Sequence, residues 1–158
     1  MAEPLADLVI RKIDQAAEQY HRLVVLVAPA GAGKTAALQD VHERTAVPLV
    51  NVNLEVSRRL LELTERQRAL QLPRFLAEIV DGSTGDVILL DNIEVLFDLS
   101  LQQDPLRLLQ GLSRNRTVVA AWSGSIVDDH MVYGVPHHPE YRRYLLRGFV
   151  VASLESVA

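Results

Sequence analysis

A glycine-rich segment, Ala28-Pro-Ala-Gly-Ala-Gly-Lys-Thr35, is the feature that most constrains the fold of this chain. It follows an unbroken apolar run over residues 23–27, which predicts a strand buried on both faces, and it leads into a helical pattern over residues 34–43. A strand, a loop and a helix in this order, with the pattern GxxxxGK[ST], are typical of a phosphate-binding loop. Only the first glycine departs from the pattern, and we expect an ordinary strand-end conformation for Ala28 in its place.

The residue types in this loop suit the binding of a nucleoside triphosphate. Gly31 and Gly33 allow the backbone to curl so that successive N–H groups point inward, and the following helix adds its positive end. Lys34 supplies a positive charge to the β- and γ-phosphates, and Thr35 binds Mg²⁺. The alternative is a glycine-rich turn with an incidental lysine. The sequence predicts ATP and Mg²⁺ as cofactors, with nucleotide contacts from Pro29, Ala30, Gly31, Ala32, Gly33, Lys34, Thr35 and Ala36.

A second candidate motif follows the apolar run over residues 87–90. Asp91 ends this predicted strand, at the edge of a parallel sheet where ligands bind, and is expected to hold Mg²⁺ through water. Many ATPases carry another acid directly after this position, but Asn92 stands there. We therefore predict Glu94, the nearest carboxylate, as the catalytic group that orients or deprotonates the attacking water. The alternatives are a turn-capping Asp91 and a solvated Glu94.

Polar residues also follow the predicted strand over residues 117–122. Ser123 and Ser125 stand where ATPases of this type keep a polar sensor of the γ-phosphate. Ordinary turn serines are an equally good interpretation.

Apolar runs alternate with helical patterns along the chain, which predicts an α/β fold. The strands are expected over residues 23–27, 47–52, 87–90, 117–122 and 148–153, and the helices over residues 5–20, 34–43, 56–80 with a break where Pro73 opens a second helix, 105–110 and 140–146. This order predicts one P-loop NTPase domain over residues 1–158, a three-layer sandwich around a five-stranded parallel sheet.

The strand over residues 47–52 lies between the two motifs along the chain, a spacing that suits the ATPase branch of P-loop proteins. We therefore expect an AAA+/ASCE-like core. Because the sequence ends directly after the fifth predicted strand, we expect no C-terminal helical lid domain.

Composition excludes several classes of protein. With 158 residues, 49% of them hydrophobic, the chain is not intrinsically disordered, and a net charge of −4 argues against a globally basic nucleic-acid coat. The absence of cysteine excludes disulfides and thiolate metal sites. No apolar run approaches the roughly 18 residues of a membrane span, and no signal-peptide core begins the sequence. We expect a soluble cytoplasmic protein that makes no membrane contact.

Arginines gather in two segments, over residues 58–74 and 142–147. In the first, the pairs Arg58–Glu62 and Glu62–Arg66 have i,i+4 spacing, which favours a salt-bridged surface over a phosphate-contacting one. In the second, Arg142 and Arg143 fall in the predicted helix over residues 140–146. We predict a homo-oligomer in which a catalytic arginine from this helix reaches the neighbouring subunit's nucleotide, with Arg114 and Arg116 as reserve candidates. The alternative is an ordinary polar helix face.

Stretches over residues 51–64, 90–97, 104–116 and 138–141 resemble the small P-loop proteins of type 3 BREX bacteriophage-defence systems, the BrxF family. The resemblance covers nearly the whole chain. It implies a bacterial cytoplasmic NTPase-type subunit that acts in host–phage discrimination with a DNA methyltransferase, a phosphatase-like protein and a helicase. It also implies DNA as a partner, contacted directly or through those proteins.

Three hypotheses for the activity follow from these residues. The first is an ATP-hydrolysing AAA+-like engine or clamp, supported by Asp91, Glu94 and the available arginines. The second is a nucleotide-gated adaptor with little hydrolysis, supported by Asn92 in place of the usual second acid. The third is a small-molecule P-loop kinase, disfavoured by the inserted strand and by the motif of four apolar residues followed by an acid.

Overall fold

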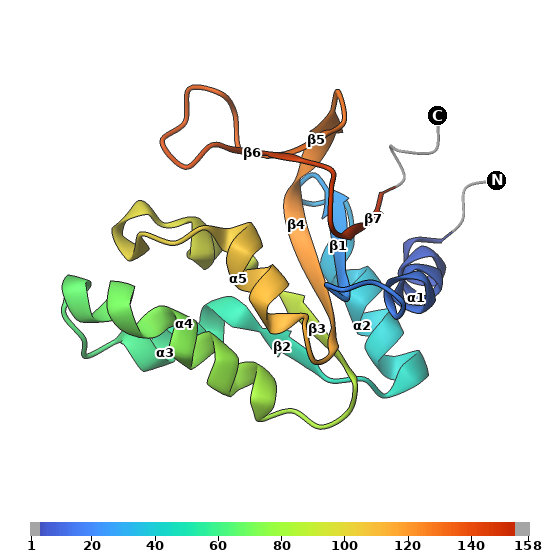
Figure 1. Ribbon diagram of the computed structural model, residues 1–158, viewed down its shortest axis with the longest axis horizontal. Helices are drawn as coiled ribbons and strands as arrows, with labels where there is room; N and C mark the ends of the chain where they lie inside the picture. Colours follow the sequence, from blue (N-terminus) through green and yellow to red (C-terminus); the bar gives the residue numbers. More distant parts are fainter. Residues whose placement is uncertain (1–3, 154–158) are drawn as a thin grey trace.

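Helices cover both faces of a central, mostly parallel sheet (Figure 1). The structure is a computed structural model that describes residues 4–153; residues 1–3 and 154–158, the two ends of the predicted domain, lie outside the described part. The strands are β1 (Leu23–Ala28), β2 (Leu49–Asn51), β3 (Val87–Asp91), β4 (Thr117–Val127), β5 (His130–Tyr133), β6 (Arg142–Leu145) and β7 (Val150–Ala152). The helices are α1 (Leu5–Ala16), α2 (Lys34–Thr45), α3 (Val52–Leu60), α4 (Glu65–Asp81) and α5 (Pro105–Leu112), with the short 3₁₀ helices η1 (Ile93–Phe97) and η2 (Leu99–Leu101).

The sheet follows the order β2-β3-β4-β1-β7, and all neighbours along this path are parallel. The predicted α/β class with a mostly parallel sheet is confirmed. Within residues 4–153 the sheet has seven strands rather than the predicted five, because β5 and β6 extend the five parallel strands in antiparallel orientation. The strand that separates β1 from β3 in space is β4, whereas β2, which separates the two motifs along the chain, lies at the edge.

The central strands are apolar throughout because helices cover both of their faces. On one face, Val24 and Leu26 of β1 join a core cluster with residues of α1 and α2. On the other, Val25 and Val27 join a larger cluster with residues of α3, α4 and α5. The sheet is therefore the middle of three layers, and the loops at its edges are left to carry polar residues.

The predicted helix over residues 140–146 is wrong. Residues 142–145 form β6, which pairs with β5, and β5 in turn pairs with the end of β4. Burial alternates along β6, since Arg142 and Tyr144 are half-buried while Arg143 and Leu145 are exposed. This period of two is that of a strand with one covered face. Four residues are too few for this period of two to be distinguished from a helical pattern in the sequence.

The break in the long helical stretch lies earlier than predicted. The α3 helix ends at Leu60, and α4 begins after a capping box in which Thr64 and Gln67 satisfy each other's backbone N–H groups. Pro73 lies exposed inside α4 instead of opening it. Among residues 4–153, no helix combines the length and apolarity required to cross a membrane.

Trp122 joins the long strand β4 to the hairpin of β5 and β6. Its side chain is fully buried, its ring meets the Phe97 ring edge-on at 5.0 Å, and its Nε1–H donates to Val132 O at 3.1 Å. A Cβ added at Gly124 would overlap Val132 O, so β5 approaches β4 closely only because this residue is glycine. The hairpin is thus fixed against the core beside the end of β1.

We expect Trp122→Ala to lower the free energy of unfolding by about 3–5 kcal/mol, because it opens a cavity and leaves Val132 O without its donor. Chemical denaturation followed by circular dichroism measures this change. Phe149→Leu, a milder change at a half-buried position, serves as a comparison. An equal loss in both variants would show that Trp122 has no special role in fixing the hairpin.

Candidate nucleotide site

The glycine-rich segment adopts the strand–loop–helix geometry that its sequence predicts. Gly31 and Gly33 have φ values of 82° and 94°, a region that favours glycine, and a Cβ at either position would meet no atom within 4 Å. The glycines are therefore required by the backbone conformation rather than by crowding. The amides that open α2 have no carbonyl partner within the helix, so they are available to an anion in the loop.

Lys34 lies at the base of this loop and is only 8% exposed. Its Nζ donates to Ala28 O and Pro29 O, each at 3.0 Å. Burial lowers the pKa of Lys34, while the nearby carboxylates of Glu94 and Asp91 act in the opposite direction. A phosphate at the loop offers this ammonium group a stronger acceptor than the two carbonyls, because the hydrogen bond is then between opposite charges.

Thr35 and Asp91 connect the loop to the end of β3. The Thr35 Oγ1 hydroxyl donates to Asp91 Oδ2 at 2.7 Å, and Asp91 is 7% exposed. The second oxygen, Asp91 Oδ1, accepts from the Asn92 N–H at 2.8 Å, which orients the carboxylate. A hydroxyl and a carboxylate side by side form a hard oxygen donor set of the kind that suits Mg²⁺. The two residues predicted as metal ligands from distant parts of the sequence are therefore adjacent.

Asn92 and Glu94 are placed by a sharp change in backbone direction after β3. Asn92 has φ 56°, in the left-handed region that asparagine tolerates better than most residues, and it precedes η1. Glu94 lies in the first turn of η1 and is exposed, and its Oε1 accepts from Ser123 Oγ at 3.0 Å. The predicted acid and one of the two predicted sensor serines are thus in contact. Ser125, in contrast, pairs with Val132 along the hairpin.

A cavity of about 410 Å³ contains the predicted residues of the two motifs together. Its lining comprises Ala30, Gly31, Gly33, Lys34, Thr35, Asp91, Asn92, Glu94 and Ser123. The other predicted loop residues, Pro29, Ala32 and Ala36, are exposed and do not line it. This cavity lies at the carboxyl ends of β1 and β3, where parallel sheets present their ligands, beside Ser123 in the middle of β4.

A neighbouring cavity, which the sequence did not predict, shares Ala30, Glu94 and Ser123 with the first. Its far wall comes from the end of β5 and the segment after it, including Tyr133 and Glu140. Burial, and then the charges of Glu94 and Glu140, raises the pKa of Tyr133 to about 12, so its phenol remains a neutral donor. No sequence signal identifies this wall, because the pattern over residues 130–146 favours a loop and a helix rather than a hairpin.

The two predicted catalytic arginines lie on opposite faces of β6. Arg142 is half-buried, and its Nη2 donates to Gln103 O at 3.3 Å. Its Nε is buried and has no partner among the described residues. Arg143 is exposed and pairs in register with Val132. Neither lines the cavity at the glycine-rich loop of its own chain.

The reserve candidates, Arg114 and Arg116, lie just before the start of β4. The glycine-rich loop follows the end of the neighbouring parallel strand β1, so these arginines lie at the opposite edge of the sheet from the loop. The Arg116 guanidinium donates to Val80 O and Ser83 O at the end of α4. The Arg114 guanidinium lies 6.0 Å from the centre of the Tyr20 ring.

The salt-bridged surface predicted for the first arginine segment is present, but with different partners. Arg58 and Arg59 both pair with Glu55, at 3.9 and 3.0 Å, and Arg74 pairs with Glu78 at 3.1 Å. The predicted pairs through Glu62 are absent from the described residues, because α3 ends at Leu60 and Glu62 lies in the turn that follows.

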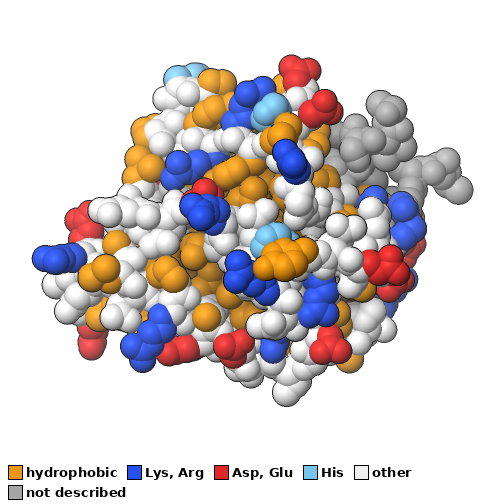
Figure 2. All heavy atoms as spheres, in the orientation of Figure 1, with side chains coloured by type: hydrophobic (Ala, Val, Ile, Leu, Met, Phe, Trp, Pro, Cys, Tyr) orange, Lys and Arg blue, Asp and Glu red, His pale blue; other side chains and the backbone are white. Residues whose placement is uncertain are grey.

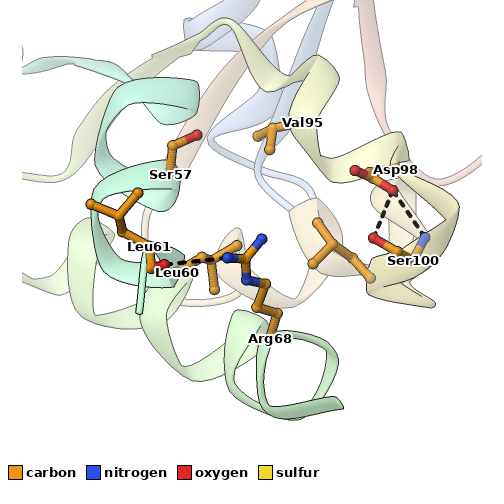
Figure 3. A pocket seen from close by; sticks show the side chains of 8 residues that line it. Ser57, Leu60, Leu61, Arg68, Val95, Asp98 and Ser100 are labelled. Carbon is orange, nitrogen blue, oxygen red and sulfur yellow. Dashed lines mark hydrogen bonds between the residues drawn. The ribbon is translucent and has the colours of Figure 1, made fainter. Parts of the chain in front are cut away.

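A smaller cavity of about 240 Å³ lies between α3, α4 and η2 (Figure 3). The Arg68 side chain in it donates to Leu63 O and Leu61 O, and Asp98 accepts from both the N–H and the hydroxyl of Ser100. These polar groups are already engaged within the chain. We assign this cavity no ligand.

No model of a known protein family and no curated protein matches the sequence. Among solved structures, the chain is similar to one described as the structure of C. elegans PCH-2, with 18% sequence identity and a TM-score of 0.38. The match covers 74% of this chain and 34% of that chain, so our chain spans about a third of its length. A likeness at this TM-score does not establish a shared function. The resemblance to the BrxF family is supported by none of these matches and stays a prediction.

Removing the charge of Asp91 and removing the charge of Glu94 should affect different steps, nucleotide binding and hydrolysis respectively. Asp91→Asn is expected to impair Mg²⁺-dependent nucleotide binding, because Asp91 contacts Thr35, whereas Glu94→Gln should slow hydrolysis and leave ATP bound. Thermal melting with MgATP measures binding, and phosphate release measures turnover. Equal loss of ATP binding in both variants would make Glu94 a metal ligand or a structural residue.

Proposed function

We propose that this protein binds MgATP in the cavity between the glycine-rich loop and β3, and hydrolyses it as an AAA+-like P-loop subunit. The observation that carries the proposal is the 2.7 Å hydrogen bond between Thr35 Oγ1 and Asp91 Oδ2, which unites the two motifs. Bound Mg²⁺ would be held by this pair and would neutralise charge on the phosphates. Lys34 adds a second positive charge from the base of the loop.

Hydrolysis requires a group that holds the attacking water. Glu94 supports this role because it lines the same cavity as Lys34 and carries a carboxylate that is exposed to solvent. Its hydrogen bond to Ser123 links it to the middle of β4, the strand next to β1. In this arrangement Ser123 acts as a positioning residue that orients Glu94 and reports on the γ-phosphate.

The runner-up is a nucleotide-gated adaptor that hydrolyses ATP slowly. It is favoured by Asn92, whose left-handed backbone turns the chain directly after Asp91, where many ATPases carry the second acid. In that case the Glu94–Ser123 contact would transmit nucleotide occupancy to β4 without catalysing turnover.

By its resemblance to the BrxF family, we further propose a role in a bacterial phage-defence complex in the cytoplasm. There the protein would act as a homo-oligomer with a methyltransferase, a phosphatase-like protein and a helicase, on DNA bound directly or through those partners. Co-purification of the tagged chain with candidate partners from cells that carry such a system tests this assignment separately from the chemistry.

A phosphate-release assay without an added acceptor, repeated with double-stranded DNA, separates the candidate activities. We expect Mg²⁺-dependent release that is lost in Lys34→Ala. Binding of ATP without release under either condition would favour the adaptor, and release only with a small-molecule acceptor would favour a kinase. No binding of any nucleotide would overturn the proposal.

A further inference from the structure

A second surface lies at the opposite end of β1 from the glycine-rich loop. It is built where the turn before β1 meets the end of α5: Arg22 N donates to Ser113 O at 3.0 Å, and His21 Nδ1 lies 3.0 Å from Gln110 O. A Cβ at Gly148 would lie 3.7 Å from Gln110 Nε2, so the turn before β7 joins the same surface. We call it the Tyr20 surface, defined by Tyr20, Arg107, Arg114 and Arg147.

The arginines of the Tyr20 surface have no acidic partner among the described residues, unlike the four arginines that form ion pairs on other helices. Among residues 4–153, ion pairs engage the arginines on α2, α3 and α4, namely Arg44, Arg58, Arg59 and Arg74. The guanidinium groups of Arg107, Arg114 and Arg147 make no ion pair or hydrogen bond with any described residue. On the face in Figure 2, positive side chains extend over the middle of the view while most acidic ones lie near its margins.

Two of these arginines, Arg107 and Arg114, lie along the direction of the α5 axis. Arg107, Gly111 and Arg114 have i, i+4, i+7 spacing and are all exposed, so they follow one face of α5 and its end. Gly111 has no side chain, and a Cβ there would meet nothing within 4 Å. The positive charges therefore flank a strip of the α5 surface in which no side chain protrudes at position 111.

Tyr20 adds an exposed aromatic ring to the Tyr20 surface. It is 74% exposed, although an aromatic ring of this size gains free energy from burial. The Arg114 guanidinium lies 6.0 Å from the ring centre, and the His21 ring lies 4.7 Å away and edge-on. An exposed ring beside guanidinium groups that lack acidic partners suits a polyanion that also offers flat aromatic groups.

We propose that the Tyr20 surface binds a single-stranded nucleic acid, with a base stacked on Tyr20 and phosphates on Arg107, Arg114 and Arg147. Stacking requires an unpaired base, because a duplex keeps its bases away from a ring at the surface. The net charge of −4 opposes approach of the strand, so the local arginines must supply the attraction and added salt must weaken it. This inference goes beyond the proposed nucleotide site and does not depend on it.

Fluorescence anisotropy of the full chain, without nucleotide, tests the proposal with labelled oligo(dT), oligo(U) and a DNA duplex of equal length. We expect both single strands to bind more tightly than the duplex, and the difference between them to show which sugar is preferred. With three phosphate contacts, the dissociation constant should rise roughly 20-fold between 50 and 200 mM salt. Preference for the duplex, or no binding at the lower salt concentration, would overturn the proposal.

Matched variants locate the binding. Tyr20→Ala should weaken single-strand binding about fivefold or more, while Tyr20→Phe, which keeps the ring, should bind within about twofold of wild type. Arg114→Ala with Arg147→Ala should weaken binding about tenfold and reduce the salt dependence, since two phosphate contacts are lost.

The control is Arg58→Ala with Arg74→Ala, which removes the same charge at ion-paired positions and should change binding little. Equal losses in the two double variants would show that net charge alone governs binding. All of these side chains are exposed, and thermal melting checks that each variant is folded. Failure of ATP to bind would leave this result unaffected, because the assay contains no nucleotide.

Discussion

Replacing Lys34 by alanine is expected to remove most of the thermal stabilisation that MgATP gives the wild-type chain. A ligand present at 100 times its Kd stabilises the folded state by roughly 2.7 kcal/mol, and this variant loses the buried positive charge at the base of the glycine-rich loop. The fold should survive, because Lys34 Nζ donates to two loop carbonyls rather than to residues of the core. Thermal melting with and without MgATP measures the shift.

The chain contains a natural control for this experiment. Lys12 on α1 has the same charge, and its Nζ donates to Gln15 on the surface of the same helix. Lys12→Ala should therefore keep the full shift with MgATP. If Lys34→Ala also keeps it, the nucleotide does not bind at the glycine-rich loop, and the proposed function is wrong.

Replacing Arg143 by alanine is expected to lower ATP hydrolysis by about 10³–10⁵-fold while leaving ATP binding nearly intact, because an arginine supplied by a neighbouring subunit contributes that much to phosphoryl transfer. The glycines of the loop and Thr35 are exposed, so a partner can approach the phosphates. Arg143 is exposed on β6, whereas Arg142 is directed to Gln103 O of its own chain. We therefore favour Arg143 over Arg142, within the proposed function.

Mixing two inactive variants tests whether the arginine acts between subunits. Arg143→Ala combined with Lys34→Ala should regain part of the activity, since some boundaries then contain one intact Lys34 and one intact Arg143. Arg66→Ala, at an exposed position on α4, is the control and should retain wild-type turnover. Hydrolysis by a protein that sediments as a monomer, with and without ATP, would contradict an arginine supplied in trans.

The nucleotide loop and the strands around it could be predicted because their signals are local. A strand buried on both faces must be apolar at every position, and residues 23–27 and 87–90 are. Gly31 and Gly33 are the residue type that permits the positive φ values found there, and Asp91 is the last residue of its strand. Local sequence therefore suffices to place Lys34, Thr35 and Asp91 at the ends of their elements.

The segment around residues 130–145 was not predictable in the same way. Its strands are four residues long, and β6 consists of two arginines followed by a tyrosine and a leucine, so neither strand has the apolar run that identified β1. Their pairing depends on the buried Trp122 ring and on the room that Gly124 leaves for Val132. These are contacts between residues far apart on the hairpin, and they outweigh the local helical pattern.

The sequence by itself determined the α/β class, the glycine-rich loop and the two acids that accompany it, because each depends on residues within one strand and its following turn. Only the tertiary structure decided that β4 lies between β1 and β3, and so brings Ser123 to Glu94. It likewise decided which arginines meet acids and which remain unpaired around Tyr20. The physical reason is that strand order and side-chain pairing arise from packing between distant segments, whose free energies no local pattern encodes.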